Sequence, residues 1–166
     1  MSTSDEATEA AWRIYSIIGD WTARVDAKAS FALTLESASA AGIIALSANG
    51  GLFAHPHGWG PRVLLWLGTV LVLASAAFAA LVVVPRLHPS RARAEAPDNF
   101  IYFGHLMHRE ATELAASLQQ TPLLPVLSRQ LVIMSRITWT KHRHVQISFA
   151  LFALGALLVF IAGVTV

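Results

Sequence analysis

Hydrophobic residues gather in three long runs that carry almost no charge, at residues 30–50, 63–85 and 145–166. Each run has about the 20 residues that a helix rising 1.5 Å per residue needs to cross a hydrocarbon core about 30 Å thick. The pattern predicts an all-α membrane protein with three transmembrane helices. The first two runs are joined by residues 51–62, a loop rich in glycine and proline.

Residues 1–29 carry an apolar stripe that predicts an amphipathic helix. Its members recur at steps of three and four residues: Trp12, Tyr15, Ile18, Trp21 and Val25. No proline lies between Ser4 and Asn49. We therefore expect this helix to continue without a break into the first transmembrane helix.

The middle region, residues 86–144, is predicted to hold one extra helix between the long ones. Pro97-Asp98-Asn99 is expected to start it and Thr121-Pro122 to end it. Its broad apolar face consists of Phe100, Phe103, Leu106, Met107, Leu114 and Leu118. A further helix begins after Pro125 and meets no breaker before the third span ends. We expect a small cytoplasmic helical bundle formed by the helix extensions and this extra helix.

Composition and charge support this organisation. Of the 166 residues, 55% are hydrophobic and 13% charged, whereas a soluble domain has roughly 25% charged residues. Residues 86–144 contain eight Lys and Arg, the N-terminal segment three and the 51–62 loop one. The excess of positive charge predicts that the N-terminus and the middle region are cytoplasmic and that the C-terminus is outside.

Catalytic signatures are absent from the sequence. It has no Gly-rich phosphate loop, no nucleophile elbow and no His-Glu-x-x-His, so we expect no enzyme, no catalytic residues and no cofactor. His105 and His108, three residues apart, are half of a zinc site at most, and a hydrolase built on them is the least favoured alternative. Such histidines are more often solvated, so no metal is expected.

Polar residues concentrate where the predicted bundle meets the membrane. Asp26 and Lys28 are two residues apart and do not share a helix face, so each needs a partner in another helix or in a ligand. Arg24 shares a face with Lys28. The facing candidates are Tyr102, His105, Arg109, Gln130, Arg136, Trp139, Lys141 and Arg143. This set suits a phosphorylated base, and the alternative is anchoring to anionic lipid headgroups.

Glu36 lies inside the first apolar run, where a carboxylate is costly unless it is paired, protonated or hydrated. One interpretation is that it reaches the headgroups or bonds a hydroxyl across a helix interface. The other is that it lines or gates a pore in an oligomer, together with Ser39 and Gly42. Small residues such as these allow close helix contacts and favour a homo-oligomer.

Three motifs lie at corresponding places relative to the spans: Asp26-Ala27-Lys28-Ala29-Ser30, Asn99-Phe100-Ile101-Tyr102-Phe103-Gly104-His105, and Arg129-Gln130-Leu131 followed by Ser135 and Lys141. In these the chain resembles the Pycsar transmembrane effector family.

The resemblance implies a bacterial anti-phage effector of the inner membrane. It would sense a cyclic pyrimidine mononucleotide, cUMP or cCMP, made by a partner cyclase, and would disrupt the bilayer to cause abortive infection. No nucleic acid polymer is expected as a partner. Carried over by motif, the positions near the ligand are Asp26, Lys28, Tyr102, Gln130 and Lys141. The alternative function is a small membrane-embedded scaffold or assembly subunit without a nucleotide ligand.

Overall fold

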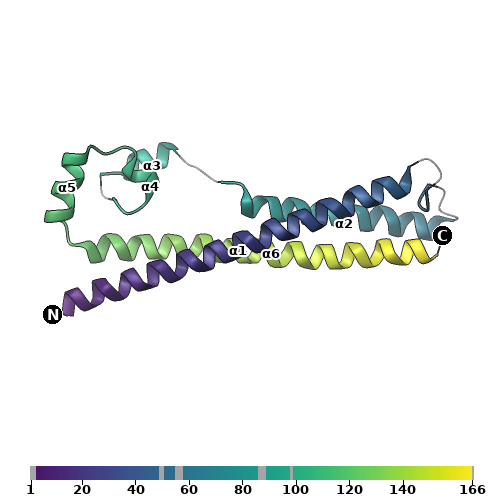
Figure 1. Cartoon of the computed structure of the whole chain (residues 1–166), viewed down its shortest axis with the longest axis horizontal. Coiled ribbons are helices and arrows are strands. Elements are labelled where there is room, and N and C mark those ends of the chain that lie inside the picture. Colours follow the sequence, from purple (N-terminus) through teal and green to yellow (C-terminus); the bar gives the residue numbers. More distant parts are fainter. Residues whose placement is uncertain (1–2, 49–50, 55–57, 86–88, 98, 166) are drawn as a thin grey trace. The chain divides into compact units, whose positions relative to one another are not determined.

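The computed structural model describes residues 3–48, 51–54, 58–85, 89–97 and 99–165, and its elements are helices throughout these ranges (Figure 1). In chain order they are α1 (Thr3–Ser47), α2 (Trp59–Val83), α3 (Pro89–Glu95), α4 (Phe103–Leu106), α5 (Ala111–Gln120) and α6 (Leu123–Val164). The first predicted helix is confirmed as one continuous element, α1, with Asp5 and Glu6 in its first turn. Acidic side chains there favour a helix start.

Three of these helices, α1, α2 and α6, are long and apolar enough to cross a membrane. The predicted fold class, an all-α membrane protein with three transmembrane helices, is confirmed. The last long helix begins at Leu123, two residues before Pro125, where we expected it to start after that proline. Proline is tolerated in the first helical turn because the amide groups there have no partner within the helix.

The chain divides into two units, which we describe separately. The polar unit comprises residues 1–23 and 85–139, and the membrane unit comprises residues 24–84 and 140–166. Both α1 and α6 contribute residues to each unit.

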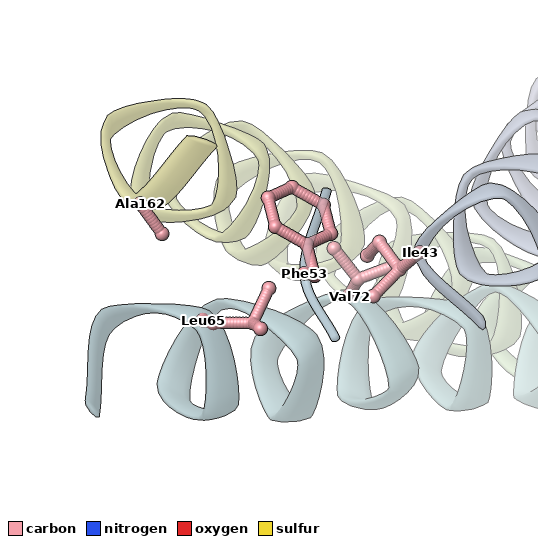
Figure 2. Packing of buried hydrophobic residues seen from close by; sticks show 5 residues of the cluster. All are labelled: Ile43, Phe53, Leu65, Val72 and Ala162. Carbon is pink, nitrogen blue, oxygen red and sulfur yellow. The ribbon is translucent and has the colours of Figure 1, made fainter. Parts of the chain in front are cut away.

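In the membrane unit, buried apolar side chains from all three helices and the loop after α1 form one cluster. Ile43 of α1, Phe53 of the loop, Leu65 and Val72 of α2 and Ala162 of α6 make up this cluster (Figure 2). A second cluster joins Val25, Ala29, Val82 and Val145. These contacts hold α1, α2 and α6 together along the unit.

Two glycines bring α2 and α6 into close contact. A Cβ atom added at Gly68 would lie 2.8 Å from the backbone oxygen of Gly155, and one added at Gly155 would lie 2.9 Å from that of Gly68. Only hydrogen at these positions permits this approach, which is typical of helix packing in membranes. In the first span, by contrast, an added Cβ at Gly42 has nothing within 4 Å in the chain, and its predicted role in a homo-oligomer stays a prediction.

The prediction of one extra helix in the middle region is wrong, because the region contains the three short helices α3, α4 and α5. Tyr102 and Glu110, which precede α4 and α5, have extended backbone conformations. Phe100, expected on the helix, is buried outside any helix, and Thr121 ends α5 as predicted. Asp98 of the expected helix start lies outside the described residues. Long-range contacts of Arg109, described below, override the helical periodicity here.

Candidate functional site

Asp26 and Lys141 form an ion pair in the membrane unit, between α1 and α6. The Lys141 Nζ donates to the Asp26 Oδ1 at 2.6 Å and to Oδ2 at 2.8 Å. The Lys141 side chain is 25% exposed and the Asp26 side chain is 40% exposed. Of the two alternatives for Asp26, the structure therefore shows a partner in another helix.

Glu36 is the most deeply buried acidic residue of the described chain, with 1% of its surface exposed. Its Oε1 accepts a hydrogen bond of 2.6 Å from the Ser148 hydroxyl of α6. The Oε2 atom is buried and has no hydrogen-bond partner among the described residues. Glu36 therefore bonds a hydroxyl on another helix, as one of its two interpretations expected, and its second oxygen has no partner among the described residues.

His105 occupies the interior of the polar unit. Its Nε2 lies 3.6 Å from the Glu95 Oε2 of α3, and its ring contacts the Tyr102 ring edge-on at 5.2 Å between centroids. Its Nδ1 is buried without a hydrogen-bond partner in the described structure. Burial lowers the pKa of His105 below its ordinary value, while the nearby Glu95 carboxylate opposes that shift.

Arg109 organises the segment between α3 and α5. Its guanidinium donates through Nε to the Ala96 carbonyl at 2.7 Å, through Nη1 to the Ser117 hydroxyl at 2.7 Å, and through Nη2 to the Pro97 carbonyl. It also lies 5.7 Å from the centre of the Phe100 ring. Within the part of the chain that the structure describes, three of its five N–H groups are engaged.

An open hollow of about 510 Å³ lies beside this arginine in the polar unit. Its lining residues are Arg93, Ala96, Pro97, His108, Arg109, Glu113 and Ser117. Its volume falls within the range of pockets that bind small ligands. Two guanidinium groups can bind an anion there, and the Glu113 carboxylate can accept hydrogen bonds from a donor group.

The other residues expected at a ligand site occupy varied environments. Arg24, Lys28 and Arg136 are exposed, whereas Gln130 is buried at 7% exposure. Among the expected residues, Asp26 binds Lys141 in the membrane unit, and the rings of Tyr102 and His105 are in contact in the polar unit. Ser39 donates to the Leu35 carbonyl of its own helix, and Gly42 is exposed. His108, the other histidine of the possible half zinc site, is exposed.

Sequence reasoning missed Glu95, Arg93, Ser117 and Ser148, which contact or surround these groups. Ser117 binds a residue 8 positions away, Ser148 binds one 112 positions away, and Arg93 lines the hollow. No local spacing in the sequence indicated these contacts. Within the described residues, no group of three or more His, Asp or Glu side chains is arranged to hold a metal ion.

Comparison with known proteins supplies the family. Residues 10–166 match the family model described as Pycsar effector protein domain. Comparisons with curated proteins and with solved structures gave no match. The match covers both units and all three apolar helices. The chain therefore belongs to the Pycsar effector family, and it is a membrane effector of that anti-phage system.

Proposed function

We propose that this effector senses cUMP or cCMP and then permeabilises the bacterial inner membrane, ending the infected cell by abortive infection. The family implies a cyclic nucleotide signal from a partner cyclase, and three helices of the chain can cross a bilayer. The effector acts through binding and membrane damage, without a catalytic step.

The hollow beside Arg109 supports nucleotide binding in the polar unit. A cyclic mononucleotide presents one phosphate anion, a ribose hydroxyl and the donors and acceptors of its base. The guanidinium groups of Arg93 and Arg109 suit the phosphate, and the carboxylate of Glu113 suits a ribose hydroxyl or a base N–H donor. This open hollow, lined by two guanidinium groups and a carboxylate, is the observation that carries the proposal.

The residues expected from the sequence remain a second proposed ligand set, at the boundary between the polar and apolar stretches. Arg24 and Lys28 are exposed and can offer positive charge to a phosphate. In this second version the nucleotide competes for Lys141, which otherwise binds Asp26. Tyr102, His105, Gln130 and Arg136, which the sequence also predicts near a ligand, belong to the polar unit and are proposed separately.

Isothermal titration calorimetry with detergent-purified protein tests both versions, with cUMP and cCMP as ligands and cAMP as the nucleotide control. The hollow predicts saturable binding that is lost in Arg93→Ala and retained in Lys28→Ala. The boundary set predicts the reverse. Arg13→Ala is the matched control because Arg13 is also exposed, belongs to the polar unit and pairs only with Glu9 of its own helix in the described structure. A folded protein that binds none of the nucleotides contradicts the sensor function.

For the membrane step, we propose that the N-terminus and the middle region are cytoplasmic, with the C-terminus outside. Nucleotide binding then shifts the chain towards a permeable, self-associated state. Glu36, Ser39 and Gly42 are the proposed pore or gating residues. The test is the electrical conductance of liposome-reconstituted protein, and conductance that saturating nucleotide leaves unchanged contradicts this step.

A scaffold or assembly subunit is the second candidate, favoured by large apolar side chains at the surface of the polar unit. Phe103 is 63% exposed and Met107 is 72% exposed, and such groups are typical of protein docking surfaces. The two functions differ in the role of the basic residues. Nucleotide sensing at the boundary set requires Arg24, Lys28 and Lys141 for toxicity but not for membrane insertion.

A further inference from the structure

Glu36 is the one ionisable residue in the three apolar runs, residues 30–50, 63–85 and 145–166. No lysine, arginine or histidine accompanies it there. The only formal charge that these runs can present to a passing ion is therefore this carboxylate. Its effect is strong because Coulomb interactions grow as the surroundings become less polar.

The environment of Glu36 leaves much of its binding capacity unused. A carboxylate can accept about four hydrogen bonds, and among the described residues Glu36 accepts one, from Ser148. Its Oε2 is buried without a partner in the described structure. An oxygen with free lone pairs in an apolar surrounding gains free energy from a cation or from water.

The Ser148 hydroxyl adds a second oxygen at the same place, on α6. After donating to the Glu36 Oε1 at 2.6 Å, it still has lone pairs that can accept or coordinate. Carboxylate and hydroxyl oxygens are hard ligands that suit cations such as K⁺ and Na⁺, and acidic residues make channels selective for cations. Nothing in the apolar runs offers an equivalent site to chloride.

We propose that Glu36 makes the permeable state of this effector selective for monovalent cations. The inference rests on the proposed permeabilisation of the membrane. In the structure described here, α6 covers the carboxylate through Ser148. Separation of α1 from α6 at this level exposes Glu36 to the ion path. The Glu36–Ser148 hydrogen bond is therefore present in the closed state and broken in the cation-selective state.

The test is the reversal potential of nucleotide-dependent current in planar bilayers that separate two KCl concentrations. Wild-type protein, with cUMP or cCMP added, is expected to reverse near the equilibrium potential of K⁺. Glu36→Gln keeps an acceptor for Ser148 and removes the charge, so its reversal potential should move to zero. Glu36→Asp should retain the wild-type potential. The matched control is Glu9→Gln, which neutralises an exposed glutamate of the same helix outside the apolar runs.

Two outcomes overturn the inference alone: a wild-type current that reverses at zero or at the chloride potential, or a Glu36→Gln current that keeps the full preference for K⁺. The first is decided by the wild-type protein and does not depend on how any variant folds. Absence of current from well-inserted wild-type protein with either nucleotide overturns the proposed permeabilisation and this inference together. The two failures are therefore distinguishable.

Discussion

Lys141 and Asp26, 115 residues apart in sequence, bind each other through both carboxylate oxygens. The pair fixes α1 against α6 in the membrane unit, just before the helices become continuously apolar. Because both side chains are partly exposed, the pair contributes about 1 kcal/mol or less to stability. Its value lies more in setting the register of the two helices.

We predict that Lys141→Ala lowers the thermal unfolding midpoint in detergent slightly, and that the charge swap Asp26→Lys with Lys141→Asp restores much of the loss. The reason is that the swap keeps an attraction between α1 and α6. The matched control is Lys28→Ala, since Lys28 is exposed, lies two residues from Asp26 and points to another helix face. A double swap that is less stable than Asp26→Lys alone and Lys141→Asp alone contradicts the pairing.

Gly68→Ala is expected to destabilise the membrane unit by about 1–3 kcal/mol, the usual cost of overpacking. The new Cβ would meet backbone and Val159 atoms at 2.8 Å, and backbone has little freedom to move. Unfolding by SDS titration measures the effect. Gly42→Ala is the control because its Cβ meets nothing within 4 Å, and equal losses from the two variants argue against the close approach of α2 and α6.

Arg109→Lys should loosen the polar unit by about 1–3 kcal/mol, because an ammonium group cannot reproduce the planar bonds to Ala96, Pro97 and Ser117. Amide hydrogen exchange should accelerate in residues 99–117. Arg13→Lys serves as the control, since Arg13 pairs with Glu9 on the surface of one helix. Unchanged exchange in that segment would mean that other contacts hold it.

The stability of the polar unit should fall as the pH drops below the ordinary histidine pKa of about 6.5. Burial lowers the pKa of His105 in the folded protein, with His108 adding to the decrease and Glu95 opposing it. The unfolded chain therefore takes up the proton first, so stability falls as the pH drops towards the folded pKa and stays at the lower value below it.

Thermal unfolding at about pH 7.5 and about pH 5.5 measures this dependence. His105→Asn should flatten it, whereas His142→Asn, a change at an exposed position of α6, should not. If wild-type protein and His105→Asn lose stability equally on acidification, His105 is not the group responsible.

Periodicity and run length were sufficient to predict the three long helices, because each must bury or present a continuous apolar face. The same reasoning failed between α3 and α5. There the spacing of Phe103 and Met107 is typical of one helix face, but both side chains are exposed. The segment is instead held by the hydrogen bonds of Arg109. Local patterns do not contain contacts made to carbonyl groups 12 and 13 residues earlier.

The candidate sites show the same division. The sequence indicated that Asp26 needed a partner outside its own helix face and that Glu36 needed a hydroxyl, water or a proton. It could not indicate which residue would be the partner of each acid, because Lys141 and Ser148 approach them only when α6 packs on α1. The hollow beside Arg109 likewise exists only after α3, α4 and α5 have folded together.

The bond between Glu36 and Ser148 also has a consequence for biosynthesis. Ser148 is translated 112 residues after Glu36, so the first span emerges from the ribosome before its hydroxyl partner exists. A lone carboxylate near the bilayer centre costs about 2.5 kcal/mol or more. The nascent first helix therefore carries Glu36 without its hydroxyl partner, and the hydrogen-bonded burial of this side chain becomes coupled to the arrival of the last helix.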